Sequence, residues 1–182
     1  MAVEIPDIDR KVSAFVVDWS REACSRWEWN PGRQLIRSIR RYQAAASRGG
    51  LLGRIGKAYW ARWHRFWSVV SGAEIPVMTK IGGGLLLPHP NGIVIHPSVE
   101  IGINCLIFQQ ATLGHGGPIP GVPRLGAHVD VGAGARLLGG ITVGSHAQVG
   151  ANSVVLVDVP PLATAVGMPA RILPRRPETP DG

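Results

Sequence analysis

Residues 125–155 read LGAHVDVGAGARLLGGITVGSHAQVGANSVV, and an aliphatic residue returns at every sixth position. The residue four places after each aliphatic is small or β-branched. The two series are Leu125, Val131, Leu137, Val143, Val149 and Val155, followed by Val129, Ala135, Ile141, Ala147, Ser153 and Val159. An α-helix repeats about every 3.6 residues and a strand every two, so neither sustains a period of six. A coil of short parallel strands joined by tight turns does, and stacked coils then share one hydrophobic core.

The same period begins earlier in the chain and is interrupted twice. Leu87 and Ile95 stand eight positions apart, so two extra residues fall within 88–92. Residues 115–123 preserve the period in length, but they contain no inward aliphatic pattern. We therefore expect a modified turn at 88–92 and a loop at 115–123 that leaves the coil.

Both interruptions contain a histidine. His89 lies in the first and His115 in the second, and His96 follows shortly after the first. Binding and catalytic residues tend to lie on loops that a rigid scaffold holds in place, and histidine is the natural general base near neutral pH. A turn residue without a chemical task is the alternative for each. His128 and His146 fall at outward positions of the repeat, where we expect ordinary surface residues.

The composition favours one globular core and argues against several classes of protein. Nineteen basic and twelve acidic residues give a formal net charge of +7, which fits nucleic acid, an anionic membrane surface or a phosphorylated ligand as partner. Cys24 and Cys105 are too few for a disulfide framework, and Cys105 falls at an inward position where a buried thiol is expected. No stretch approaches the ~20 apolar residues of a membrane span, and the acidic N-terminus does not resemble a signal peptide. We therefore expect a cytoplasmic protein.

Helix-forming residues dominate residues 1–74, with helices expected over 18–29, 31–47 and 51–70. The last of these interleaves five aromatic residues with basic ones, a pattern that fits a membrane surface or a nucleic acid. We favour packing on the end of the solenoid or on a neighbouring subunit, because an open solenoid end needs a cap. No nucleic acid and no membrane partner is therefore expected.

Five motifs in the second half of the chain resemble those of the serine O-acetyltransferases, which belong to the hexapeptide-repeat acyltransferases. They are LPHPNGIVI at 87–95, QATLG at 110–114, VGAGA at 131–135, VGANSVV at 149–155 and VGMPARI at 166–172. The resemblance covers about residues 75–173 and implies a mainly β fold, a left-handed parallel β-helix, behind a short α-helical segment at 1–74. A proline-rich tail, expected to be flexible, follows at 174–182.

The resemblance also implies partners and roles for individual residues. The family's catalytic histidine aligns with His89, and residues that line its acetyl-CoA groove align with Gly114, Ala133 and Ala151. The family transfers an acetyl group from acetyl-CoA to the hydroxyl of a small acceptor, here most simply L-serine, in cysteine biosynthesis. It works without a metal and as a homotrimer with active sites between subunits.

Three family positions are changed in this chain. The aspartate before the catalytic histidine is Pro88, and an Arg-His pair before a proline is Gly121-Val122. His115 and Arg124 are the nearby side chains that could hold the acceptor in place of that pair. Acceptor specificity therefore departs further from the family than the type of reaction does.

Three other functions fit the same sequence. The acceptor could be a sugar or another hydroxyl metabolite. The scaffold could be a γ-type carbonic anhydrase-like zinc enzyme, since His89, His96 and His115 could serve as three ligands of a catalytic zinc. The chain could also be a non-catalytic interaction module in which the changed residues mark a lost activity.

Overall fold

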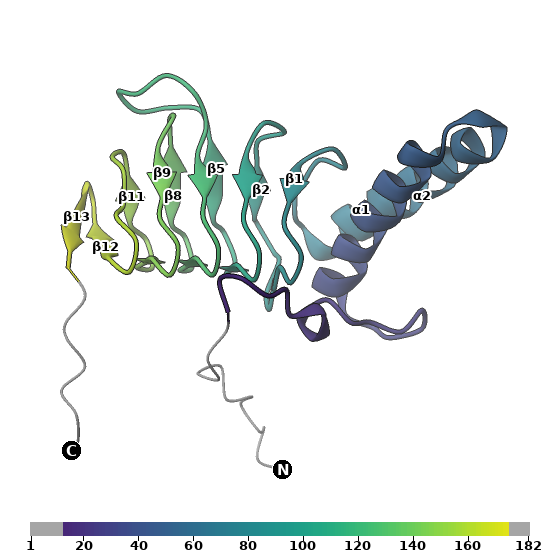
Figure 1. The fold of residues 1–182 in the computed structure, drawn as a ribbon, viewed down its shortest axis with the longest axis horizontal. Helices are drawn as coiled ribbons and strands as arrows, with labels where there is room; N and C mark the ends of the chain where they lie inside the picture. Colours follow the sequence, from purple (N-terminus) through teal and green to yellow (C-terminus); the bar gives the residue numbers. More distant parts are fainter. Residues whose placement is uncertain (1–12, 175–182) are drawn as a thin grey trace, which may run out of the picture.

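In a computed structural model of the chain, which describes residues 13–174, a row of short strands winds into a parallel β-helix (Figure 1). A hairpin of two helices lies at one end of it. The helices are α1 (Pro31–Arg48) and α2 (Gly50–Ser71), preceded by the single 3-10 turn η1 (Trp19–Arg21). All strands follow the hairpin in sequence, so the described chain consists of a helical N-terminal part and a C-terminal β-helix.

Three sheets form the sides of the β-helix. The β1 sheet contains β1 (Lys80–Ile81), β3 (Glu100–Ile101), β6 (Arg124–Leu125) and β9 (Thr142–Val143). The β4 sheet contains β4 (Leu106–Ile107), β7 (Asp130–Val131), β10 (Gln148–Val149), β12 (Thr164–Gly167) and β13 (Ala170–Leu173). The β2 sheet contains β2 (Val94–Ile95), β5 (Thr112–Gly114), β8 (Arg136–Leu138) and β11 (Val154–Val155). All pairs are parallel except β12 with β13, an antiparallel pair that ends the coil.

Each coil visits the β1, β4 and β2 sheets in that order, and three corners join them. The first corner leads from the β1 sheet to the β4 sheet, the second from the β4 sheet to the β2 sheet, and the third back to the β1 sheet. In the regular coils, strands of one sheet pair across a spacing of eighteen residues, as for Gln148 with Asp130. The spacing is twenty where the widened turn at 88–92 intervenes, as for Lys80 with Glu100, and sixteen in the last coil, as for Thr164 with Gln148. The spacing is twenty-four where the loop at 115–123 intervenes, as for Arg124 with Glu100.

The six-residue period corresponds to the buried core. Its leading residues are nearly all inaccessible, from Leu125 at 5% exposure to Val131, Leu137 and Val143 at 0%. The small partners four places later are buried as well, including Cys105 at 0%. The full burial of Cys105 confirms the expectation of a buried thiol, and that burial raises the pKa of the thiol to about 12.

Left-handed backbone conformations recur at the same place in successive corners. At the first corner they occur at Gly84, Asn104, His128, His146 and Leu162, and at the second at Gly92, Gln110, Gly134 and Asn152. Glycine and asparagine adopt this conformation most easily. Glycine or asparagine occupies five of these nine positions, and the turns impose the same conformation on Gln110, His128, His146 and Leu162.

The helix expected over 18–29 is wrong. Only η1 forms there, and residues 13–22 instead lie against the first corner of the β-helix. The Asn104 side chain accepts from the Asp18 N–H at 2.8 Å and donates to the carbonyls of Ser13 and Val16, each at 2.7 Å. These tertiary hydrogen bonds replace the local bonds of a helix.

A half-buried ion pair joins this N-terminal segment to α1. The Arg40 guanidinium contacts both carboxylate oxygens of Glu22, at 2.8 and 3.1 Å, and also donates to the carbonyls of Ile81 and Gly82. Glu22 in turn accepts from the Leu85 N–H at 3.0 Å. Helix α1 is thereby fixed to the first coil.

The helical hairpin follows its sequence more closely. Asn30 caps α1 by accepting from the Arg33 N–H at 3.1 Å, and Pro31 occupies the first turn as expected. The two helices approach closely at Gly53 and Gly56, where an added Cβ would meet Ala45 at 2.9 Å in each case. Helix α1 covers the end of the β-helix, whereas α2 packs mainly on α1 and leaves Tyr59 and Phe66 exposed. The cap is therefore formed by α1 together with the C-terminal part of α2, whose Trp67 joins the core.

Candidate functional site

His89 lies in the widened turn at the second corner. The turn is fixed by backbone bonds: Gly92 N–H donates to the Gly72 carbonyl at 2.8 Å, and Gln110 N–H to the Asn91 carbonyl at 2.9 Å. Pro88 and His89 are both exposed at its outer edge. A well-held backbone therefore presents the His89 imidazole to a ligand that approaches this corner.

Ala133 and Ala151 lie in two later turns of the same corner. They are successive in the stack, because Asn152 N–H donates to the Ala133 carbonyl at 2.8 Å. Their small side chains project little from the surface of this corner, so an extended molecule has room to lie along it. The structure therefore places His89 and both alanines on one edge of the β-helix.

Gly114 and His115 lie at the third corner, where the long loop leaves the coil. Gly114 is buried, and its carbonyl accepts from the Gly139 N–H at 3.0 Å. His115 is exposed, and its ring meets that of His96 edge to face with the centroids 4.4 Å apart. His96 Nδ1 accepts from the Ser98 N–H at 3.1 Å, so in neutral His96 the ring proton lies on Nε2.

The backbone conformation of the loop at 115–123 favours glycine at position 121. Gly121 adopts a φ of 124°, and a Cβ there would lie 3.1 Å from the Gly140 Cα. Gly140 N–H also donates to the Ile119 carbonyl at 3.0 Å, which ties the loop to the next coil. A large side chain at position 121, such as the family's arginine, does not fit this loop path.

Arg124 stands on the face of the β1 sheet. Its Nε lies 4.0 Å from the Glu100 carboxylate, which Lys80 Nζ contacts at 2.7 Å. The hydrogen bond and charge of Lys80 hold the pKa of Glu100 below its usual value. Arg124 is adjacent to the loop in sequence, but its charge is directed to Glu100, and the structure shows no contact with His115.

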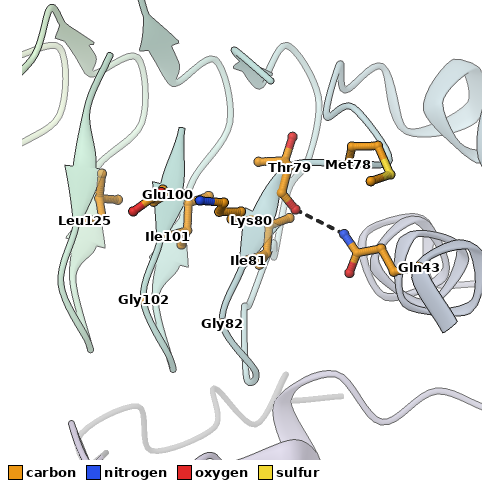
Figure 2. A pocket seen from close by; sticks show the side chains of 10 residues that line it. All are labelled: Gln43, Met78, Thr79, Lys80, Ile81, Gly82, Glu100, Ile101, Gly102 and Leu125. Atoms are coloured by element: carbon orange, nitrogen blue, oxygen red, sulfur yellow. Dashed lines mark hydrogen bonds and ion pairs between the residues drawn. The ribbon is translucent and has the colours of Figure 1, made fainter. Parts of the chain in front are cut away.

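A hollow of about 600 Å³ opens on the same β1 sheet, beside α1 (Figure 2). Lys80, Glu100 and Leu125 line it from the sheet, and Gln43 from α1 donates a hydrogen bond to the Thr79 carbonyl at its edge. None of the six residues expected to bind or react lines this hollow. Of the six, Arg124 alone lies on this face, where it approaches Glu100 at the edge of the hollow, and the other five lie elsewhere on the β-helix.

The candidate residues thus divide between two edges. His89, Ala133 and Ala151 mark the second corner, whereas Gly114 and His115 mark the third, and the strands of the β2 sheet separate the two corners. His89 lies before β2 and His96 after it, so the three histidines considered as zinc ligands do not converge within one chain. Among residues 13–174, no group of three or more His, Cys, Asp or Glu side chains is placed to hold a metal ion.

The coil of hexapeptide repeats defines the fold class, which is a left-handed parallel β-helix, as the sequence predicts. Comparison with known proteins finds that this chain is similar to the serine acetyltransferases.

Similar proteins carry that name in distant organisms. "Probable serine acetyltransferase 1" of Oryza sativa is 48% identical over 106 residues, which are 57% of this chain and 35% of that protein. The structure of Brucella abortus serine acetyltransferase superposes with a TM-score of 0.69 at 30% identity, covering 81% of this chain and 58% of that one. A serine acetyltransferase in complex with CoA gives a TM-score of 0.64 at 36% identity over 80% of this chain and 58% of that one.

The match does not extend over whole relatives. This chain spans between 35% and 62% of the length of the first curated relatives. No protein-family model matches it. The sequence similarity covers 106 residues of this chain, whereas the structural similarity covers 80% of it and so extends beyond the β-helix into the helical region.

Two sets of contacts were not predicted from the sequence. The pairing of Val94 with Thr112 places His96 opposite Gly114, eighteen residues later, and the ring of His115, one position further along, meets the His96 ring edge to face. The spacing of the repeat therefore places the two histidines near each other but does not predict their ring contact. The docking of residues 13–22 had no such signal, because it depends on a side chain about ninety positions away along the chain.

Proposed function

We propose that the protein transfers an acetyl group from acetyl-CoA to the hydroxyl of a small acceptor, with residues 75–173 as the catalytic domain. The observation that carries this proposal is an exposed His89 on a rigid turn, on the same edge as Ala133 and Ala151. Relatedness to the serine acetyltransferases, one of them solved with CoA, supports acetyl-CoA as donor. L-Serine is the first acceptor to test.

The two-edged arrangement supports a homotrimer. One small molecule cannot readily contact the second and third corners of the same chain, because a side of the β-helix lies between them. Cyclic assembly would bring the second corner of one copy to the third corner of the next. Each site would then combine His89 of one copy with Gly114 and His115 of its neighbour.

The chemistry assigned to His89 is general base catalysis. Its imidazole takes the acceptor's hydroxyl proton as the oxygen bonds to the thioester carbonyl carbon. A backbone N–H near Gly114 would stabilise the oxyanion that develops. When the C–S bond breaks, the proton on His89 passes to the thiolate, whose conjugate acid has a pKa near 8.5. These bond and proton changes balance without a metal ion and without a covalent acyl-enzyme intermediate.

The first test is the variant His89→Ala. The expected result is a loss of kcat of ~10²-fold or more, the usual effect of removing a general base, with CoA affinity unchanged. Steady-state kinetics and calorimetric titration with CoA measure the two quantities. Activity within a few-fold of the unmodified protein would remove His89 from the mechanism, whereas activity of neither protein would leave the interaction module as the better account.

The second test concerns the acceptor. Pro88, Gly121 and Val122 replace charged or basic family residues, and a charge-assisted hydrogen bond contributes roughly 1.5–3 kcal/mol. L-Serine should therefore be used with a high KM, near or above ~1 mM, the upper end of common values. Kinetics with L-serine and uncharged hydroxyl compounds compare the two acceptor classes. A low-micromolar KM for L-serine would contradict this expectation.

A further inference from the structure

The helical hairpin is the most positively charged part of the molecule. Residues 31–73 contain nine of the nineteen basic residues and none of the twelve acidic ones. The nine are Arg33, Arg37, Arg40, Arg41, Arg48, Arg54, Lys57, Arg62 and Arg65. In the described part of the chain only Arg33 and Arg40 of these form ion pairs, with Glu28 and Glu22. The remaining charge has no counterpart within the hairpin.

Helix α2 has an apolar face that the protein does not cover. One face, with Gly53, Gly56 and Trp67, packs on α1. A second face projects large apolar side chains at helical spacing, and these are the most exposed of the helix. They are Leu51 (70%), Leu52 (82%), Ile55 (58%), Tyr59 (49%), Phe66 (45%) and Val69 (78%). A large exposed apolar surface of this kind marks a site of interaction with another molecule or with a membrane.

A basic face adjoins the apolar face. Arg54, Lys57 and Arg65 lie about a quarter to a half turn from Ile55 and Phe66 at ~100° per residue, and Arg62 lies among the apolar side chains themselves. A helix with one apolar and one basic face binds in the plane of a lipid–water interface. The aromatic and aliphatic side chains enter the interface while the basic ones meet the headgroups.

A small hollow in the hairpin has the chemistry of an anion site. It holds about 290 Å³ between the helices and is lined by Arg26, Arg37, Arg41, Tyr59, Trp60 and Trp63. Among residues 13–174 no carboxylate forms an ion pair with these three arginines. Tyr59 belongs both to this hollow and to the apolar face, so the hollow opens beside that face.

We propose that the α1–α2 hairpin binds the surface of an anionic lipid bilayer, with the apolar face of α2 in the interface and a headgroup phosphate in the arginine-lined hollow. The hairpin projects from one end of the β-helix, away from the later coils, so it can meet a flat surface without covering those coils (Figure 1). Described helices are not long and apolar enough to cross a membrane, which fits binding at the surface.

Two other occupants are less complementary. A second hairpin would bring nine more positive charges against the first, a repulsion that a lipid surface lacks. Single-stranded nucleic acid is held by stacking on aromatic rings, but Leu51, Leu52, Ile55 and Val69 are aliphatic. The sequence-based expectation of no membrane partner rested on α2 packing on the solenoid end or on a neighbouring subunit. Trp67 does pack in the core, with Trp63 and Val70 beside it, but the apolar face of α2 stays exposed in the single chain.

The test uses the full chain and sedimentation with vesicles. Phosphatidylcholine vesicles containing phosphatidylglycerol should bind the protein, and pure phosphatidylcholine vesicles should bind it far more weakly. The triple variant Arg54→Gln, Lys57→Gln, Arg65→Gln should lose affinity by roughly fivefold per charge. The matched control, Lys80→Gln, Arg136→Gln, Arg171→Gln, removes three exposed charges from the β-helix and should change little. Ile55→Ser with Val69→Ser should also weaken binding.

Several outcomes would overturn the proposal. One is equal loss in the control variant, which would mean that net charge alone governs binding. Another is full binding by the Ile55 and Val69 variant together with a change in its mass by light scattering, which would make the apolar face a contact between copies. Binding of RNA or of soluble glycerol phosphate without vesicle binding would assign the hollow to a free anion. Circular dichroism of each variant verifies the fold.

Discussion

At the scale of single residues, the turns of the β-helix contain interactions that the repeat alone does not suggest. His128 and His146 occupy equivalent left-handed positions at the first corner, and their Nδ1 atoms lie 2.8 Å apart. One ring must donate and the other accept, so the pair requires at least one neutral imidazole. Burial lowers the pKa of His128 from 6.5, opposed by Asp130 and assisted by His146 and Arg21.

This depression predicts a pH dependence of stability. A second histidine, His64, also has a pKa below 6.5 because it is half-buried. The unfolded chain binds more protons than the folded one in this range, so the free energy of unfolding should decrease as the pH falls through 6.5. Urea unfolding at pH 7.5 and 5.5 measures the change.

The variant His128→Asn provides the comparison for that measurement. Asparagine accepts the φ of 52° at this position, and it removes one titrating group and its pairing with His146. The unfolding free energy of the variant should therefore change less between the two pH values. Equal slopes for both proteins would exclude His128 as a source of the effect.

At the scale of elements, the segment 13–22 is held by a side chain of a turn. Asn104 is fully buried and makes three hydrogen bonds to that segment, and Arg21 adds bonds to the carbonyls of Gly84 and Cys105. The segment thus joins the β-helix, although it precedes the helical hairpin in sequence. The position of residues 13–22 therefore depends on the side chain of a single turn residue, Asn104.

The variant Asn104→Gly tests this attachment. Glycine keeps the φ of 58° at this turn, but it loses three hydrogen bonds of ~1 kcal/mol each. Trypsin should cleave after Arg21 at least ~10-fold faster, because the segment opens more often. Asn152→Gly is the matched control, since Asn152 has a φ of 56° in an exposed turn of the second corner. Equal cleavage of both variants would contradict the role of Asn104.

At the scale of the whole molecule, the candidate residues lie on two separate corners of the β-helix. This separation predicts how copies of the chain assemble. Each site is proposed to combine the second corner of one copy with the third corner of the next. A variant altered at the second corner and a variant altered at the third corner should therefore complement each other in a mixed trimer. Light scattering should give about three times the 19.4 kDa chain mass. A monomer at micromolar concentration would contradict the trimer.

The repair experiment uses His89→Ala and Gly114→Val. A Cβ at Gly114 meets nothing closer than the His96 Cβ at 3.8 Å, so valine should fold there while narrowing the third corner. Each variant alone should be inactive. Co-refolded in equal amounts, they should recover about one quarter of the activity, the fraction of random contacts with both edges intact. No recovery would place the two edges in the same site of one chain.

The sequence by itself determined the coil. A period of six fixes which side chains point inward, and the breaks at 88–92 and 115–123 fix where His89 and His115 leave the regular turns. These are local properties, because the direction of a side chain follows from its place within one strand and one turn. The inward residues from Ile95 to Val159 are buried as this reasoning predicts.

Only the tertiary structure decided which of those residues meet. His96 stacks on His115, His128 pairs with His146, and residues 13–22 dock on Asn104, all through the stacking of coils that are distant in sequence. Helix α2 was expected to pack on the solenoid end or on a neighbouring subunit. Its Trp67 does pack in the core, while Gly53 and Gly56 bring the earlier part of the helix close to Ala45 of α1. Such contacts depend on the summed packing of segments far apart in the chain, which no local pattern encodes.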